Sequence, residues 1–477
     1  MSAVTPILRN TQDVDARRFD VVVVGGGIQG ILCALESAQR GLGTLLVEAG
    51  DYGAATSFNS LRTVHGGLRY LQWLDFARAR HSNAQQRWWF RNFPDLVESR
   101  ACLMPLARGG GLRGRTAFRV AGLLARLSGM RDPAEHGTAV PAVELLTAEE
   151  VLGRLPDFPA QGLRGAALWQ EGFMPESSRL VIECLRWAVS AGVTAINYVE
   201  LAAARPEHRG CVRLELSDRV SGAALSVVAG AVINASGAQT EEVGIRLGAR
   251  MRSLLVPTLA WNLFLDAKLP DAACVVLTPP RRRAHTYFVQ PFHGRVLAGT
   301  GHAAIEERRH GNQVSPALID AMRRDLGAAW PRAGLGEARV LRVLAGLLPG
   351  VRPGRPQLAL RPRIVRDSGT GNVAVVHVVG VKFTESPDVA RRALDHIVAA
   401  AKLRGMARPA AGSGWNLAGG RDPATRESLL DLATNESVVY LDDLIERRTN
   451  AWCDEAASEA IARLIGESFP RHPRERN

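Results

Sequence analysis

Apolar residues near the start of the chain form two short unbroken runs, separated by a glycine-rich turn and a stretch with helical periodicity. The first run, Phe19–Val24, has the length of a strand, and Gly25–Gly30 follow it with the spacing GxGxxG. Apolar positions then recur as on one face of a helix as far as Arg40, and the second run, Thr44–Val47, ends at Glu48. This order predicts a strand, a tight turn, a helix and a second strand, as in a Rossmann-type unit.

Later in the chain, the pattern separates buried strands from a sheet with one polar side. Val227–Ile233 and Val373–Val379 are continuous apolar runs, which are typical of strands covered on both faces. Residues 251–349 alternate apolar and polar positions instead, as in Tyr287–Phe292, and this predicts an antiparallel sheet. Residues 403–477 begin in a linker rich in Ala, Pro and Gly and then become helical. The predicted class is α/β, with a Rossmann-type domain, an antiparallel-sheet substrate domain and a short helical C-terminal region.

The glycines of the first turn suit a nucleotide. Gly25 allows a sharp turn, Gly27 carries no side chain to block a pyrophosphate, and Gly30 lets the helix pack closely on the strand. The helix N-terminus faces the phosphates, and Glu48 is placed to bind a ribose. A cofactor-free turn is the simpler alternative for GxGxxG alone, but the second strand and its terminal acid favour a nucleotide. The predicted contacts are Gly25, Gly27, Ile28, Gln29, Gly30, Glu48 and Ala49.

The residues after Glu48 distinguish FAD from NAD, because a polar loop replaces the next βαβ unit of an NAD enzyme. Ala55–Leu71 reads ATSFNSLRTVHGGLRYL and, together with Glu48–Asp51, resembles the FAD-dependent glycerol-3-phosphate dehydrogenases, a family of D-amino-acid-oxidase-like flavoproteins. Leu441–Thr449, LDDLIERRT, is similar to the C-terminal motif of that family, which a generic flavoprotein does not need. Further similarities lie at Trp169–Arg179, Asn234–Ala238, Arg295–Gly301 and Gly380–Thr384.

The resemblance implies noncovalent FAD and a set of contacts to it. Thr56, Ser57 and Ser60 would bind the diphosphate and the ribityl chain. The other implied FAD contacts are His65, Gly66, Gly67, Ala235, Gly237, Gly380, Lys382, Phe383 and Thr384. The implied catalytic and substrate-binding residues are Arg69, Tyr70, Arg361 and Lys382. The implied reaction is oxidation of a CH–OH group by hydride transfer to flavin N5, with glycerol 3-phosphate or a related anionic alcohol as substrate.

Several positions depart from the family pattern on the substrate side. The family's GGKxTTYR loses its tyrosine and arginine at Ser386 and Pro387, and the arginine of its GVRP corresponds to Leu348 unless Arg352 takes its place. Val256–Phe264 lacks the family's histidine. Ser386 and Pro387 predict instead a helix start, with the serine as cap. The general base stays open by residue type among Tyr70, His65, His285, His293, His302 and His377.

The positions of the implied FAD contacts predict a discontinuous FAD-binding domain. It comprises residues 1–105, 165–250 and 350–402. The other predicted parts are a basic amphipathic insertion at 106–164, the substrate domain at 251–349 and the helical C-terminal domain at 403–477.

Composition limits the partners. The net charge of +12 attracts anions, whether phospholipid, nucleic acid or substrate. All but three of the 59 basic residues are arginines, a common effect of genome composition, and no motif accompanies a nucleic-acid role. Within 108–131, however, arginines alternate with apolar residues, which indicates either a helix on an anionic membrane or an ordinary surface helix. The six dispersed cysteines predict free buried thiols and no metal site.

The expected location is the cytoplasm, with peripheral attachment to the inner face of the membrane as a further possibility. No apolar run approaches the roughly 18 residues that span a bilayer, and the first twenty residues lack the apolar centre of a signal peptide. The expected electron acceptor is quinone or oxygen. Two functions stay open beside the dehydrogenase: an amino-acid or amine oxidase of the same superfamily, and a flavoprotein with degenerate activity.

Overall fold

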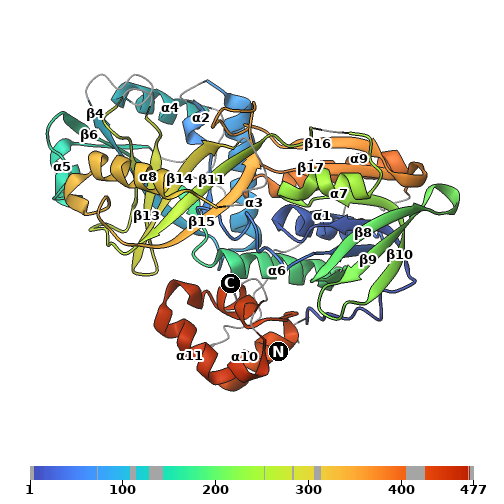
Figure 1. The fold of residues 1–477 in the computed structure, drawn as a ribbon. Coiled ribbons are helices and arrows are strands. Elements are labelled where there is room, and N and C mark those ends of the chain that lie inside the picture. The colour runs from blue at the N-terminus through green and yellow to red at the C-terminus, as the bar shows by residue number, and fades with distance from the viewer. Residues whose placement is uncertain are drawn as a thin grey trace.

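Two β-sheets form the two halves of the molecule, and helices from the C-terminal end lie against both (Figure 1). The structure is a computed structural model. It describes residues 5–71, 74–107, 114–127, 143–251, 253–281, 284–305, 313–403, 425–470 and 472.

The first sheet has a parallel centre in the order β17-β10-β1-β2-β7, with β16 antiparallel at one edge and β8 and β9 attached to β10. The strands of this sheet are β1 Arg18–Val24, β2 Thr44–Val47, β7 Thr194–Ile196, β8 Val199–Pro206, β9 Val212–Asp218, β10 Ala224–Asn234, β16 Arg363–Ser368 and β17 Ala374–Val379.

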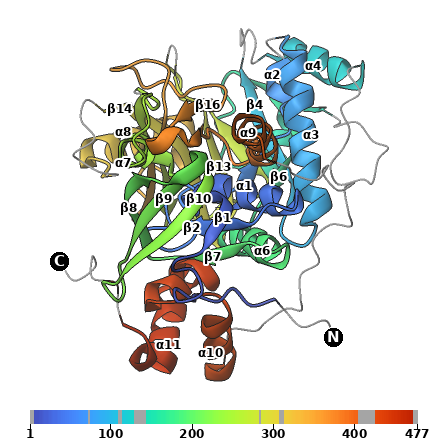
Figure 2. The ribbon, with the colours of Figure 1, turned by 90° about the vertical axis from the view of Figure 1, so that its right-hand side faces the viewer.

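Both faces of the parallel strands are covered, which explains their unbroken apolar sequences. Val21 and Val23 pack under the helices α1 (Ile28–Gln39), α6 (Ser177–Ser190) and α9 (Ser386–Ala401). Val22 and Val24 pack on the opposite side, in the apolar cluster that holds the inner faces of β8 and β9. The result is a layer of helices, a parallel sheet and an antiparallel ribbon, as Figure 2 shows from the side. This confirms the predicted Rossmann-type arrangement.

The second sheet runs in the order β15-β11-β14-β13-β12-β4-β6-β3, with β5 beside β6. Its strands are β3 Thr63–Val64, β4 Glu98–Ala107, β5 Glu144–Leu146, β6 Leu163–Phe173, β11 Pro257–Leu265, β12 Cys274–Leu277, β13 Tyr287–Phe292, β14 Arg295–Ala304 and β15 Val340–Pro349. Strands β11 to β15 are antiparallel neighbours, as the alternating sequence predicts. The predicted domain boundaries stay a prediction. β3, β4 and most of β6 lie in residue ranges that were predicted for the FAD-binding domain, but these strands pair in the second sheet.

The two faces of the second sheet have different partners. One face carries Trp261, Leu263 and Val289 and packs on α8 (Pro316–Ala329). On the other face, the side chains of Asn262 and Gln290 hydrogen-bond to the loop that follows β2. The remaining helices are α2 Leu68–Leu71, α3 Phe76–Asn92, α4 Arg115–Leu127, α5 Ala148–Arg154 and α7 Thr240–Arg246.

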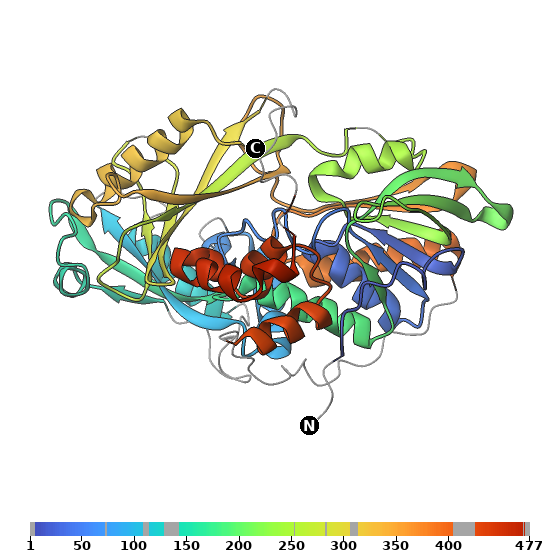
Figure 3. The ribbon, with the colours of Figure 1, turned by 60° about the horizontal axis from the view of Figure 1, so that its bottom comes forward.

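The C-terminal region consists of α10 (Arg426–Asn435), a π-helical turn at Asp443–Arg448 and α11 (Glu455–Ile465). Seen from below, these helices lie across the junction of the two halves (Figure 3). All six cysteines are buried and free. Within the described ranges, no helix is long and apolar enough to cross a membrane.

Candidate active site

The glycine turn between β1 and α1 leaves no room for side chains. Gly25 has a φ of +110°, and a Cβ atom there would lie 2.6 Å from the carbonyl oxygen of Ala235. A Cβ on Gly30 would lie 1.8 Å from the carbonyl oxygen of Gly25. Ile28 N, in the first turn of α1, donates a hydrogen bond to Ser57 Oγ at 3.0 Å. The turn, the helix N-terminus and the serine of the following loop therefore form one cradle of the kind that receives a diphosphate.

Glu48 is fixed at the end of β2 by the backbone around it. Its two carboxylate oxygens accept hydrogen bonds from Gly26 N at 2.6 Å and from Gly50 N at 2.7 Å. Burial raises the pKa of Glu48, and these two bonds oppose that rise. The carbonyl of the next residue, Ala49, accepts a bond from Arg219 Nη1 at 3.0 Å. Because each carboxylate oxygen has two lone pairs, Glu48 keeps acceptor capacity for a ribose hydroxyl.

The second sheet holds the loop that contains Thr56, Ser57 and Ser60. Gln290 Nε2 donates to the carbonyl of Leu61 at 2.6 Å, and Asn262 Nδ2 donates to the carbonyl of Asn59 at 2.9 Å. Asn59 in turn donates to the carbonyl of Ala345 at 2.8 Å. Thr56 lies against Gly346, where an added Cβ would be 2.4 Å from the threonine methyl group. Ser60 Oγ accepts from Arg62 N at 3.4 Å. The loop is thus held by strands of the second sheet as well as by α1.

The turn after β17 is tied to the same cradle. Gln29 Nε2 donates to Ser386 Oγ at 2.9 Å and to the carbonyl of Lys382 at 3.3 Å. An added Cβ on Gly380 would lie 2.6 Å from Gln29 Nε2, so this glycine is required for the approach. The predicted cap at Ser386 was wrong: the helix has Glu385 at its N-cap, and the Ser386 hydroxyl donates to the carbonyl of Phe383 because the turn folds back on itself.

His65 lies where this turn, α3 and the second sheet meet. His65 N donates to Thr384 Oγ1 at 3.0 Å, and the carbonyl of Thr384 accepts from Trp89 Nε1 at 3.1 Å. The Phe383 ring lies 5.0 Å from the Trp89 ring. The imidazole of His65 meets the ring of Phe288 edge to face at 5.6 Å. Thr384 and Phe383 therefore position this turn through protein contacts.

The glycine pair after His65 is explained by helix packing. An added Cβ on Gly66 would lie 2.7 Å from Gln86 Oε1, and one on Gly67, where φ is +87°, would lie 2.7 Å from Ser82 Cβ. Gly66 N also donates to the buried carboxylate of Glu171 at 2.6 Å. The packing of α3 therefore requires Gly67 whether or not a flavin lies beside it, whereas at Gly66 only the end of the Gln86 side chain would have to move.

Two cationic side chains lie against Tyr70. The Lys382 Nζ atom contacts the hydroxyl group of Tyr70, and the guanidinium of Arg78 lies 4.1 Å from the centre of its ring. Burial lowers the pKa of Lys382, with the charge of Glu385 opposing this. Of the predicted substrate residues, Tyr70 and Lys382 are thus in contact. Arg361 is exposed on the segment that leads into β16. Arg69 lies on α2, and its side chain is outside the described residues.

Comparison with known proteins gives the family of the chain. Residues 20–391 match the family of FAD-dependent oxidoreductases named DAO. The chain belongs to this family. Ala235 and Gly237, the remaining predicted FAD contacts, follow β10 directly, and Ala235 N donates to the carbonyl of Val24 at 2.9 Å, beside the glycine turn. FAD is therefore the cofactor, and the glycine cradle, the acid of β2 and the fastened loop fit it.

Several relatives of this FAD-dependent oxidoreductase are named as glycerol-3-phosphate dehydrogenases. The chain is 30% identical over 406 residues to glycerol-3-phosphate dehydrogenase 1 of Mycobacterium tuberculosis, covering 82% of this chain and 75% of that protein. It is 29% identical over 320 residues to the aerobic glycerol-3-phosphate dehydrogenase of Staphylococcus saprophyticus, covering 65% of this chain but only 55% of the relative. The chain thus spans little more than half of that relative's length.

Solved structures show the same fold. The glycerol-3-phosphate dehydrogenase from Bacillus halodurans, complexed with FAD, superposes with a TM-score of 0.73 at 18% identity and covers 98% of this chain and 93% of that one. Glycine oxidase from Geobacillus kaustophilus superposes with a TM-score of 0.55 at 18% identity and covers 80% of this chain and 95% of that one. At this identity, the likeness carries the fold and not the substrate.

The histidines of this oxidoreductase occupy different surroundings. His377 on β17 is fully buried, with Nδ1 3.0 Å from Asn234 Nδ2 and Nε2 3.4 Å from an oxygen of Asp367, which indicates a structural role. His293 follows β13 directly and lies 3.4 Å from Glu176. His302 on β14 lies opposite Ala260 of β11, and burial lowers its pKa to about 4.

Arg78 is the functional candidate that the sequence motifs missed. It lies in the first turn of α3, where Asp75 caps the helix by accepting from Arg78 N at 3.1 Å. It falls outside HGGLRYL, and no recognised motif marks it. Its nearness to Tyr70 in the chain is the only local signal that could have found it.

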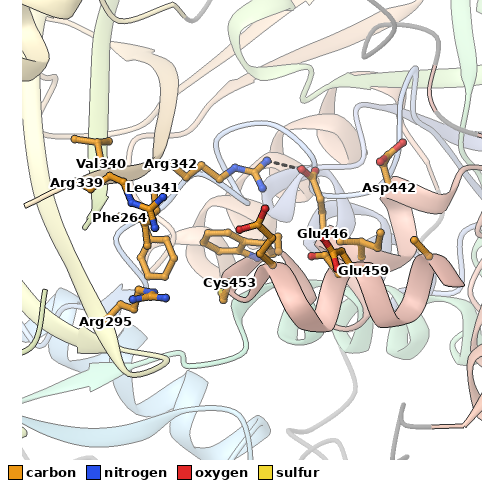
Figure 4. A pocket seen from close by; sticks show the side chains of 15 residues that line it. Phe264, Arg295, Arg339, Val340, Leu341, Arg342, Asp442, Glu446, Cys453 and Glu459 are labelled. Atoms are coloured by element: carbon orange, nitrogen blue, oxygen red, sulfur yellow. Dashed lines mark hydrogen bonds and ion pairs between the residues drawn. The ribbon is translucent and has the colours of Figure 1, made fainter. Parts of the chain in front are cut away.

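A cavity of roughly 600 Å³ lies elsewhere, between β15 and α11 (Figure 4). Arg295, Arg339 and Arg342 line one side, and Glu446, Glu455 and Glu459 line the other. None of the residues predicted to bind FAD lines this cavity, so it is separate from the candidate active site.

Proposed function

We propose that this FAD-dependent oxidoreductase oxidises the secondary hydroxyl of a small anionic alcohol, with glycerol 3-phosphate as the first candidate. The observation that carries the proposal is the contact between Lys382 and the hydroxyl group of Tyr70, beside Arg78. A desolvated lysine and a fixed guanidinium favour an anion. The relatives named as glycerol-3-phosphate dehydrogenases support a phosphorylated alcohol.

FAD, when bound, supplies the acceptor for the hydride of the substrate C–H bond. The glycine turn, Glu48 and the loop around Ser57 would hold its nucleotide part, and the segment near His65 and Lys382 would lie by its reactive part. The chain's own contribution is to orient the alcohol and to hold positive charge. Lys382 is suited to stabilise negative charge at the reacting end, because burial has removed part of its hydration.

The test is anaerobic bleaching of the flavin absorbance in the holoenzyme by glycerol 3-phosphate, other hydroxy acids, amino acids and glycerol. We expect glycerol 3-phosphate or another anionic alcohol to bleach the flavin, and uncharged glycerol to fail. Tyr70→Phe is expected to keep FAD and slow the bleaching, because Lys382 loses its hydroxyl partner. Bleaching by an amino acid alone would establish the oxidase instead, and bleaching by no compound would favour degenerate activity.

We further propose that α4 docks on an anionic membrane, where quinone would accept the electrons. Val120 and Leu123 are 45% and 57% exposed on this helix, and Arg115 and Arg119 are exposed beside them. Apolar and basic side chains on one exposed helix suit the headgroup region of a bilayer. The predicted stretch continues through residues 108–113 and 128–131, which lie outside the described residues.

Flotation with phosphatidylglycerol vesicles at low salt tests this docking. The protein is expected to float with the vesicles, and Val120→Glu to reduce the floating fraction. Val220→Glu is a matched control, because Val220 is also 45% exposed but lies between β9 and β10 in the other half. Equal flotation of the two variants would refute docking through α4. Oxygen consumption compared with quinone reduction would identify the acceptor.

A further inference from the structure

We propose that Arg78 is the residue that binds the anionic group of the substrate, in place of the arginines that this chain has lost relative to its family. The inference rests on the proposed function and names its specificity-determining residue. Arg78 lies in the first turn of α3, on the side of Tyr70. Its guanidinium is 4.1 Å from the ring centre, and the Lys382 Nζ atom lies 4.7 Å from the same centre. One aromatic ring therefore holds two cations.

The orientation of Arg78 is fixed before any ligand arrives. Its plane is held by the Tyr70 ring, and Nη2 donates to the carbonyl of Leu360 at 2.9 Å. Nε is buried and has no hydrogen-bond partner among the described residues. Such a guanidinium loses little side-chain entropy on binding and keeps donors for a phosphate or carboxylate.

The charges of Glu385 and Asp75 act on Arg78 without forming an ion pair with it. Within the described part of the chain, no ion pair joins Arg78, Lys382 or Arg361 to a carboxylate. The pKa of Arg78 is lowered, first by burial and also by the positive charge of Arg361, against the charges of Glu385 and Asp75. The partly buried guanidinium therefore has no direct carboxylate partner that a bound anion would have to displace.

Arg78 is partly buried, whereas Arg361 is exposed. Arg361 is exposed and follows Leu360, whose carbonyl Arg78 holds. This contact ties the chain at Leu360 to α3, and the neighbouring Arg361 stays exposed. Leu348, which corresponds to a family arginine, lies on β15 opposite Thr258 and supplies no charge. Arg78, on α3, would therefore supply the positive charge that Leu348 on β15 does not.

The experiment compares Arg78→Ala with Arg80→Ala in the FAD-loaded protein. Arg80 is exposed, two residues along the same helix, and so controls for the loss of one positive charge. Inorganic phosphate is the probe, read by flavin absorbance and by thermal stabilisation. We expect Arg78→Ala to weaken phosphate binding, and to raise KM for an anionic alcohol, about 10- to 100-fold, the effect of one charge-assisted hydrogen-bonded contact. Arg80→Ala should match the wild type.

The outcomes separate this inference from the proposed function. If no anionic alcohol bleaches the wild-type flavin, the proposed function fails, while the loss of the phosphate response in Arg78→Ala still supports Arg78 as an anion site. If the wild type oxidises an anionic alcohol and Arg78→Ala keeps the same KM and phosphate affinity, the proposed role of Arg78 is refuted. The proposed function would then stand. Arg78→Lys keeps the charge but not the planar guanidinium. Its affinity for phosphate should lie between those of the wild type and Arg78→Ala. Lower FAD content with unchanged phosphate affinity would also overturn the inference.

Discussion

Arginines are used in opposite ways at the two ends of the molecule. At the C-terminal interface, buried arginines meet carboxylates: Arg448 donates to both oxygens of Asp51, at 2.8 and 2.9 Å, and Arg447 Nε donates to Asp51 at 2.6 Å. At the substrate end, Arg78 and Lys382 meet an aromatic ring and no carboxylate among the described residues. Paired arginines hold the protein together, whereas unpaired ones are available to a ligand.

The paired arginines attach the C-terminal helices to the cofactor half. Asp51 comes three residues after Glu48, and Arg447 and Arg448 end the π-helical turn of the LDDLIERRT motif. Glu436 extends the network by accepting from Arg179 at 2.8 and 2.9 Å. This gives the family's C-terminal motif a structural purpose, because it clamps the segment that follows the predicted ribose-binding acid.

Arg62 is an intermediate case. It is fully buried and no nitrogen of its side chain has a hydrogen-bond partner among the described residues. It lies 5.4 Å from the ring centre of Phe58, 5.5 Å from that of Phe292 and 5.8 Å from that of Trp452. Burial lowers its pKa to about 10. The three rings come from the cofactor loop, the second sheet and the C-terminal region, so Arg62 joins all three without a carboxylate.

The largest effect is expected from breaking the paired network. Asp51→Asn removes the buried carboxylate that both arginines share, and the free energy of unfolding should fall by about 3 to 5 kcal/mol. Arg447 would keep Asp443 and Glu446, but Arg448 would keep only Glu436 at 3.8 Å. Chemical denaturation of the holoenzyme measures this. Glu459→Gln, which breaks an exposed pair with Arg463, is the control and should change little. An equally small change in the free energy of unfolding of Asp51→Asn would contradict a stabilising role for the paired arginines.

The same pair gives a pH dependence at the acid side. The two arginines lower the pKa of Asp51 to about 2, against the effect of its burial. A carboxyl group with a lowered folded-state pKa stabilises the protein above its unfolded value and loses that contribution as the pH falls towards 2. The wild type should therefore lose stability through this range more steeply than Asp51→Asn.

A smaller effect is expected at His302 on β14, which burial keeps neutral. Its pKa falls to about 4, mainly through burial and also through the nearby His285. Because the unfolded chain binds this proton first as the pH drops, stability should decrease from pH 6.5 to about 4, by about 3 kcal/mol for 2.5 pKa units. In denaturation experiments, the stability of His302→Gln should lack this part of the pH dependence. The stability of His293→Gln should keep it. An unchanged slope in His302→Gln would contradict the burial of this imidazole.

The smallest effect is expected where a buried arginine has no carboxylate. Arg62→Met removes a desolvated charge and keeps an unbranched side chain among the rings, so stability should change by less than about 1 kcal/mol. Arg448→Met should cost several times more, because it leaves Asp51 with a single arginine. Equal losses in the two variants, measured by denaturation, would remove the distinction between paired and unpaired arginines.

Much of the cofactor side could be predicted because its information is local. The turn at Gly25–Gly30, the acid at Glu48 and the helix that begins at Ser386 follow from spacing over a few residues. On the proposed substrate side the roles of the predicted residues stay predictions: Arg361 matches a motif and lies exposed, while Arg78 matches none and lies on Tyr70. The pairing of β4 with β12 was also missed, because strand neighbours far apart in the chain leave no local pattern.

The sequence by itself determined the glycine turn, the apolar strands and membership of an FAD-dependent family, because backbone conformation and motif spacing are set by neighbouring residues. Tertiary structure alone decided which charges have partners. Asp51 meets Arg448, and Lys382 meets Tyr70, only where distant segments approach each other. Burial strengthens each such charge interaction, and burial is a property of the folded chain rather than of any segment.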